Sequence, residues 1–99
     1  MNLNEKQAIT LAEQALKDIG HWENFDIQKA TFISKETDNY YDGDYWLVSF
    51  EFKKGDDIFP IVTVIDGTKY VHSVSWKTSH FHLSYDKEKD KYFHPTLSR

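Results

Sequence analysis

The sequence predicts an α+β domain in which one N-terminal amphipathic helix packs on one face of a four- to five-stranded antiparallel meander sheet. Over residues 4–19, apolar residues recur at three- and four-residue spacing, which is the periodicity of a helix with one buried side. From residue 25 onward, runs of β-branched and aromatic residues alternate with short polar turns, and short turns join antiparallel neighbours. We therefore expect a single domain, 1–99, whose one helix leaves the second sheet face uncovered.

The predicted helix carries both a start and a stop signal. Asn4 is a favourable N-cap, and Gln7 stands three positions later, where its side chain closes a capping box. Gly20 adopts without steric cost the left-handed conformation that ends many helices. The apolar side is rich in alanine, whose small side chain allows a helix to approach a sheet closely.

Residues 45–53 and 58–65 predict the central hairpin of the sheet. In the first run, Trp46 and every second residue after it are apolar, and the residues between them are mainly polar, as a strand with one buried face requires. The second run is apolar on both sides, which indicates a central strand or one whose outer face meets another layer. Pro60 has no N–H donor, so it predicts a bulge or a locally unpaired edge within this run.

Two further strands are predicted at residues 25–34 and 70–76. Residues 80–85 either extend the last of these past a bend near residues 78–79 or begin another hairpin. We favour a bend and a short fifth strand, because one continuous strand would be too long for this domain. Residues 91–94 are a candidate for a returning strand.

Composition restricts the protein's class. The chain has no cysteine, which excludes a disulfide scaffold, thiolate metal sites and a cysteine nucleophile. Its N-terminus shows no apolar signal segment, and no stretch is long and apolar enough for a membrane span, so we expect a soluble cytoplasmic protein with no membrane partner. The formal net charge is −4, and residues 36–57 alone hold seven acidic and two basic residues. This acidity argues against nucleic acid as a partner and favours a basic protein.

Three stretches of the chain form a familiar set: Ala8-Ile9-x-x-Ala12-x-x-Ala15-Leu16 ending at Gly20, Tyr45-Trp46-Leu47-Val48-Ser49-Phe50, and Val62-Thr63-Val64-Ile65-Asp66-Gly67-Thr68-Lys69-Tyr70-Val71. They resemble the helix, the central strand and the closing strand–turn–strand of PepSY-type domains. The same outline is shared by small cystatin-like folds and by several bacterial immunity proteins that neutralise toxins. PepSY domains are usually exported or membrane-tethered, and this chain shows neither signal, which favours the analogy with immunity proteins. The resemblance rests on core and turn positions and assigns no functional residue.

One acidic and aromatic loop, supported by the next turn, is the predicted partner-binding site. Tyr and Trp bury a large area at low entropic cost, and carboxylates pair with Arg and Lys of a basic partner. The alternative is a soluble loop whose aromatic rings fold back onto the sheet. The predicted partner-binding residues are Asp38, Tyr40, Tyr41, Asp42, Asp44, Tyr45, Trp46, Asp56 and Asp57.

The histidines offer only weak candidates for chemistry. His80 and His82 fall on one face of a strand, and His72 and His94 precede and follow them, so a zinc site is conceivable. No carboxylate ligand is identifiable and no spacing matches a known zinc motif, so we predict no metal and no cofactor. His72 is the only candidate acid–base group, and no nucleophile stands beside a base. We therefore predict that the protein is not an enzyme.

These observations lead to a protein-binding function. The first interpretation is an immunity or inhibitor protein that neutralises a toxin by occluding a basic site, with the acidic loop and the uncovered sheet face making the contacts. The alternative is a PepSY-like module that regulates a peptidase or binds an extended peptide at a sheet edge. Self-association into a homodimer stays open beside both.

Overall fold

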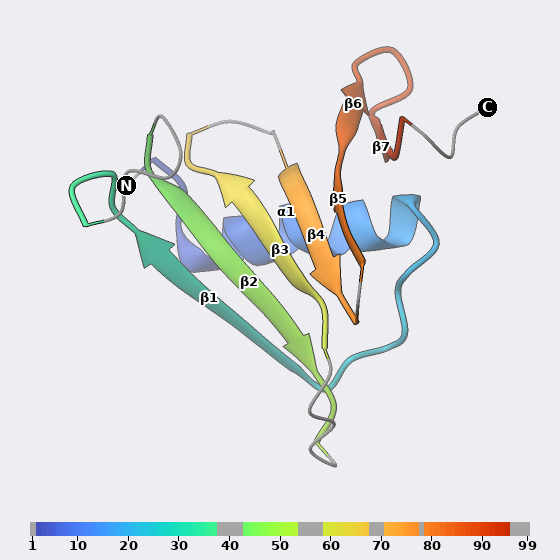
Figure 1. The fold of residues 1–99 in the computed structure, drawn as a ribbon, viewed down its shortest axis with the longest axis horizontal. Coiled ribbons are helices and arrows are strands. Elements are labelled where there is room, and N and C mark those ends of the chain that lie inside the picture. The colour runs from blue at the N-terminus through green and yellow to red at the C-terminus, as the bar shows by residue number, and fades with distance from the viewer. Residues whose placement is uncertain (1, 38–42, 54–58, 68–70, 78, 96–99) are drawn as a thin grey trace.

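The computed structural model describes residues 2–37, 43–53, 59–67, 71–77 and 79–95. It confirms the predicted α+β fold, with one helix packed against a five-stranded antiparallel sheet in the order β1-β2-β3-β4-β5, followed by a two-stranded sheet of β6 and β7 (Figure 1). The elements are α1 (Glu5–Asp18), β1 (Ile27–Ile33), β2 (Tyr45–Glu51), β3 (Ile61–Ile65), β4 (Val71–Trp76), β5 (Ser79–His82), β6 (Ser84–Asp86) and β7 (Lys91–Phe93).

Both predicted signals of the helix are confirmed. The backbone N–H of Gln7 donates to Asn4 Oδ1 at 2.8 Å, and the N–H of Asn4 donates to Gln7 Oε1 at 2.9 Å, which is a complete capping box. Gly20 has a φ of +80° at the other end. The N–H of Gly20 donates to the carbonyl of Lys17, and that of His21 to the carbonyl of Leu16, which is the pattern of a Schellman motif. Local sequence therefore fixes both ends of α1.

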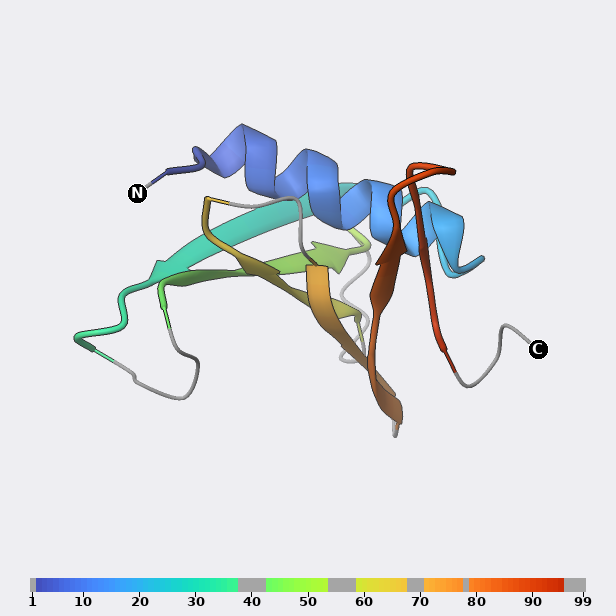
Figure 2. The ribbon, with the colours of Figure 1, turned by 90° about the horizontal axis from the view of Figure 1, so that it is seen from above.

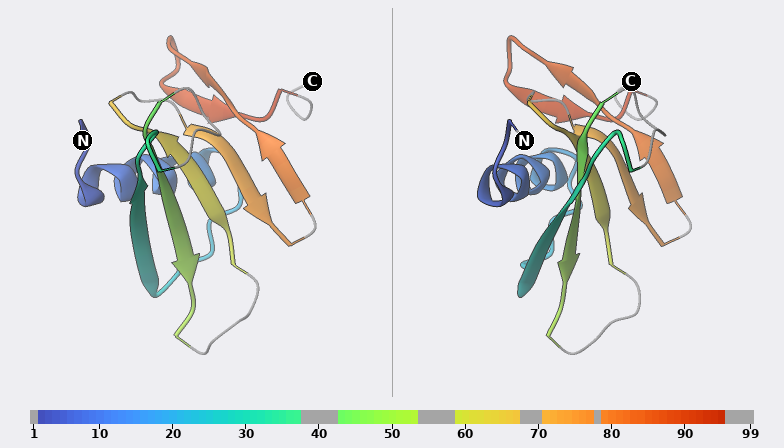
Figure 3. Two further views of the ribbon diagram at one scale, coloured as in Figure 1. Left: turned by 60° about the vertical axis from the view of Figure 1, so that its left-hand side comes forward. Right: turned by 90° about the vertical axis from the view of Figure 1, so that its left-hand side faces the viewer.

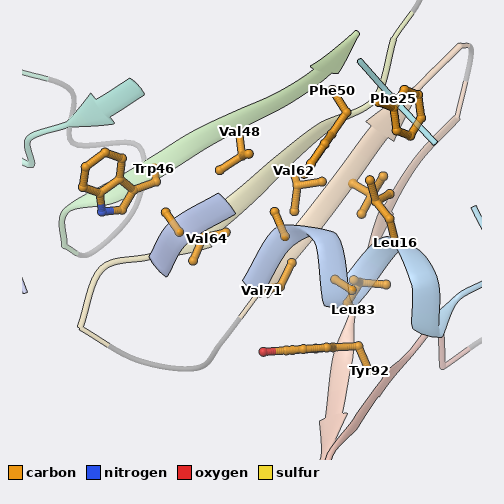
Figure 4. Packing of buried hydrophobic residues seen from close by; sticks show 14 residues of the cluster. Leu16, Phe25, Trp46, Val48, Phe50, Val62, Val64, Val71, Leu83 and Tyr92 are labelled. Atoms are coloured by element: carbon orange, nitrogen blue, oxygen red, sulfur yellow. The ribbon is translucent and has the colours of Figure 1, made fainter. Parts of the chain in front are cut away.

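The helix and the sheet form two layers with the core between them (Figure 2). The buried side chains of α1 are its alanines and Leu16, and they meet alternate residues of β2 and β3 and two valines of β4 (Figure 4). β2 follows the predicted alternation, since Trp46, Val48 and Phe50 are buried on the helix side. β3 is the central strand of the sheet, as its apolar character on both sides predicted. It begins at Ile61, directly after Pro60, so the proline precedes the strand instead of interrupting it.

A bulge in β4 changes the predicted alternation of that strand. The register between β3 and β4 shifts between the pairs Thr63–Ser73 and Val64–Val71, which leaves His72 as the additional residue. Val71 and Val74 are consequently both fully buried in the core, although strict alternation places them on opposite faces. The bulge thus supplies two core valines from one strand.

The chain after β4 turns back and pairs antiparallel with it as β5, so this stretch begins another hairpin, which was the alternative to the favoured bend within one strand (Figure 1). The hairpin of β6 and β7 then packs beside the helix, and Leu83 and Tyr92 complete the core. The backbone N–H of Tyr92 donates to Asp18 Oδ2 at 3.0 Å, and the side-chain amide of Gln14 donates to the carbonyl of Asp90 at 3.2 Å. Polar bonds therefore fasten this hairpin to the last turns of α1. Burial raises the pKa of Tyr92 to about 12.

The turn after β3 is bonded to the N-terminal segment. Asp66 Oδ2 accepts the N–H of Asn2 at 2.7 Å, and Oδ1 accepts the N–H of Leu3 at 2.8 Å and the indole N–H of Trp46 at 3.0 Å. One carboxylate thus connects the residues before α1, the turn after β3 and the first residues of β2. Among the described residues, none of the helical structure is long and apolar enough to cross a membrane.

Candidate protein-binding face

The side of the five-stranded sheet that faces away from α1 is the candidate functional surface, and we call it the open face. No described helix or strand lies over it, and Figure 1 views the sheet from this side with α1 behind it. Strand alternation and the pairing register decide its members. They are Ile27, Lys29, Thr31 and Ile33 of β1; Tyr45, Leu47, Ser49 and Glu51 of β2; Ile61, Thr63 and Ile65 of β3; Ser73 and Ser75 of β4; and His80 and His82 of β5.

The open face combines aliphatic, hydroxyl and ionisable side chains. Ile61, the first residue of the central strand β3, has 38% of its surface exposed and is the only exposed large apolar side chain among the described residues. Leu47 on the neighbouring strand is half-buried, whereas Thr63 beside it is buried. Lys29 and Glu51 form an ion pair of 3.4 Å on the β1 side. A sheet face of this mixed composition is typical of protein-binding surfaces.

The described part of the predicted acidic and aromatic site is engaged within the protein itself. Tyr45 and Trp46 are only 5% and 4% exposed. The Trp46 ring lies on the helix side, 5.2 Å from the ring of Phe32. Asp44 Oδ1 accepts the backbone N–H of Lys35 at 2.7 Å. Both side chains are therefore largely buried within the protein, Trp46 on the helix side and Tyr45 on the side of the open face, and their role in partner binding stays a prediction.

The other predicted partner-binding residues, Asp38, Tyr40, Tyr41, Asp42, Asp56 and Asp57, lie outside the described residues, and their role stays a prediction. The described neighbours show how the two acidic segments enter the fold. Gly43 precedes β2 and Lys53 follows it, so the segments join opposite ends of one strand. Seven residues of strand span roughly 20 Å at about 3.3 Å each. A partner that contacted both segments would therefore lie along β2, over the open face.

Three histidines meet where β4 and β5 pair on the open face. The rings of His72 and His82 are 4.8 Å apart between centroids, and those of His80 and His82 are 5.4 Å apart. His80 Nδ1 is hydrogen-bonded to the hydroxyl of Ser75. The bulge in β4 brings His72 to this group, which spacing alone could not show. Within the described part of the chain, no three histidine, aspartate or glutamate side chains are arranged to hold a metal ion. His94 lies apart from these rings, against Phe81.

The histidine group predicts an acid-sensitive stability. Burial, and then the neighbouring His82 and His80, lower the pKa of His72 below its ordinary 6.5. The unfolded chain therefore binds a proton more readily than the folded one just below pH 6.5, so stability from this site is complete above that pH and declines as the pH falls. We expect the free energy of unfolding, from urea titrations between about pH 7 and pH 5, to fall less steeply for His72→Gln than for the wild type. Equal slopes would contradict this expectation.

A second concave region lies between the end of α1 and the β6–β7 hairpin. It is a cavity of about 390 Å³ lined by carboxylates, lysines and aromatic rings. Its carboxylates already have backbone partners, since Asp18 accepts the N–H of Tyr92 and Asp86 accepts those of Glu88 and Lys89. These bonds make the cavity part of the hairpin's attachment.

Sequence reasoning did not single out Ile61 or Asp66. The outward position of Ile61 follows from alternation once β3 is known to begin after Pro60, so the signal was present but the strand's start was placed too early. Asp66 stands in an Asp-Gly turn, where aspartate is common for local reasons. Its bonds to Asn2 and Trp46 join positions 64 and 20 residues away.

Comparison of the chain with protein-family models, with curated proteins and with solved structures finds no match in any of the three. The predicted resemblance to PepSY-type and cystatin-like domains therefore stays a prediction. Function has to be argued from the open face and the charge of the chain.

Proposed function

We propose that this chain is a protein-binding module whose open face receives a basic partner protein, as an immunity or inhibitor protein does when it occludes the basic site of a cytoplasmic toxin. The observation that carries the proposal is the asymmetry of the sheet. One face is covered by α1, whereas the other has no described layer and presents the exposed Ile61 at the start of its central strand. An exposed aliphatic side chain with a polar surround is the usual composition of a binding patch.

Charge favours a basic occupant. Residues 36–57 contain seven acidic residues and two basic ones, and this stretch includes β2 together with the segments that join its two ends. A partner over the open face would lie along β2, within reach of acidic chain at either end of the strand. Enzymes that act on polyanionic nucleic acid have basic clefts, so a toxin nuclease has the complementary charge. Complementary potentials increase the association rate and discourage wrong partners.

The first test is capture of the partner with matched variants. Tagged wild-type protein, Ile61→Lys and Thr10→Lys are each incubated with lysate of the source organism, and bound proteins are identified by mass spectrometry. Ile61 is exposed on the central strand of the open face, whereas Thr10 is exposed on α1, which covers the opposite side of the sheet. We expect a basic protein to bind the wild type and Thr10→Lys, and to bind Ile61→Lys at least about tenfold more weakly.

The captured protein is then produced in a host cell alone and together with this chain. The proposal requires that it be harmful alone and that wild type, but not Ile61→Lys, restore growth. Equal recovery by all three proteins, or an acidic captured protein, would contradict the assignment of the open face.

A second test addresses charge. Neutralising four carboxylates takes the formal net charge from −4 to zero, and we expect a slower association with the captured partner and a weaker dependence on salt. Asp44 is left intact because its carboxylate holds the N–H of Lys35, so its loss would also disturb the fold. Surface plasmon resonance at several salt concentrations measures the effect. The variant replaces Asp38, Asp42, Asp56 and Asp57 with Asn.

A further inference from the structure

The two edges of the five-stranded sheet differ in a way that points to a second interaction. β5 is a short edge of four residues that carries two histidines and runs on, after Leu83, into β6. β1 is an edge of seven residues that pairs with β2 on one side, and no other described segment pairs with its outer side (Figure 3). Its outer row of backbone N–H and carbonyl groups is therefore a template for another strand.

β1 also lacks most of the features that usually protect such an edge. Residues 27–33 contain no proline and no glycine, and all seven pair with β2 in a continuous register without a bulge. The single charged residue is Lys29, and its ammonium group is directed along the sheet to Glu51, 3.4 Å away. Natural sheets blunt exposed edges with prolines, bulges, short strands or outward charges. β1 is long and regular, and its one such feature is Lys29, whose exposed ammonium group is paired within its own sheet, so the edge stays open to another strand.

We propose that β1 pairs antiparallel with β1 of a second copy of this chain, which joins the two sheets into one of ten strands. The sequence of β1 is complementary to itself about Ala30. With Ala30 opposite its counterpart, Ile27 lies opposite Ile33, and Lys29 lies opposite Thr31, all on the open face. On the helix side, Gln28 lies opposite Phe32. No like charges oppose one another in this register, whereas facing lysines would be destabilising.

This symmetry is compatible with the proposed binding face. A two-fold axis perpendicular to the sheet places both helices on one side and both open faces on the other. The half-buried Phe32 would gain additional cover from the second copy, which adds apolar contact to the backbone hydrogen bonds. Pairing at β1 uses backbone groups at the edge, so Ile61 on the central strand of each open face stays accessible to a partner.

The test measures the monomer–dimer equilibrium of the purified chain by sedimentation over a wide range of protein concentration. Thr31 is exposed, so its side chain can be changed without disturbing the core. Thr31→Lys places an ammonium group opposite Lys29 of the second copy, and Thr31→Glu places a carboxylate there, twice per dimer in each case. We expect the dimer dissociation constant to rise about three- to tenfold for Thr31→Lys and to fall by a similar factor for Thr31→Glu.

A charge swap checks the register. The double variant Lys29→Glu with Thr31→Lys restores opposite charges across the interface, and its dissociation constant should fall below that of Thr31→Lys, even though the ion pair between Lys29 and Glu51 is lost. Thr10→Lys on the outer side of α1 should leave the wild-type value unchanged. A wild type that stays monomeric at the highest concentration overturns the proposal. A dimer that responds equally to Thr31→Lys and Thr31→Glu, or that is lost only in Ile61→Lys, also overturns it, because each result places the contact elsewhere.

Discussion

Phe50→Ala is expected to lower the free energy of unfolding by about 3–5 kcal/mol, which is the usual cost of truncating a fully buried phenylalanine. Phe50 has none of its surface exposed and lies at the helix side of β2. Its ring centroid is 5.6 Å from Trp22 and 5.7 Å from Phe25, so the substitution empties a position that joins the sheet to the connection after α1. Urea unfolding followed by circular dichroism measures the change.

Phe52→Ala is the matched control, because it removes the same side chain from a position two residues further along. Phe52 is only partly buried, although its ring lies 4.9 Å from Phe25. The residues around it can adjust toward solvent, so we expect a loss below roughly 2 kcal/mol. A result in which Phe52→Ala costs as much as Phe50→Ala would show that this end of the core is packed differently from the structure.

Asp66→Asn is expected to cost about 2–3 kcal/mol at neutral pH. The carboxylate of Asp66 accepts three hydrogen bonds, from the backbones of Asn2 and Leu3 and from the indole of Trp46. Hydrogen bonds to a charged group contribute about 1.5–3 kcal/mol each when isolated, and an amide leaves one of the facing donors without an acceptor. Asp26→Asn is the control, because Asp26 accepts one backbone bond, from Lys53 at 3.0 Å, in an exposed position.

The same aspartate predicts a characteristic pH dependence. Burial alone would raise the pKa of Asp66, but the bonds from Asn2, Trp46 and Leu3 together with the charge of the N-terminus lower it below its ordinary value of 3.8. A carboxyl whose pKa is lower in the folded state contributes stability above its unfolded pKa, and this stability is lost as the pH falls through the folded value. Asp66→Asn should therefore differ most from the wild type above about pH 4 and converge with it in stronger acid. A constant difference down to pH 2 would contradict this assignment.

Features determined by neighbouring residues could be predicted from the sequence, and features determined by pairing between distant segments could not. The capping box of Asn4 and Gln7 and the turn at Gly20 depend on residues only a few positions apart, so both ends of α1 could be predicted from the sequence. The alternation in β2 likewise follows from one run. The bulge at His72 depends on how β4 pairs with β3, and no residue within β4 signals it.

The candidate site illustrates the same limit. Acid and aromatic residues next to one another in sequence suggested a common surface, yet Trp46 points to the helix side and Tyr45 is buried. The carboxylate of Asp44 already accepts a hydrogen bond from the backbone N–H of Lys35. The uncovered second sheet face was predictable because one helix covers only one face. Which residues are exposed on it, such as Ile61, depended on the register.

The bulge in β4 also affects how relatives of this chain would have to be aligned with it. A one-residue deletion at His72 would restore regular pairing with β3 and would return the strand to strict alternation. Consider two descendants of one ancestor, one with the bulge and one without it. On one side of position 72, the residues that point into the core in one protein would then be numbered one position differently from those in the other. An ungapped comparison of them would match core positions to outward ones over half a strand. The pattern to search for in divergent relatives is thus a pair of buried valines three positions apart, with His-Ser between them, and not an alternating pattern.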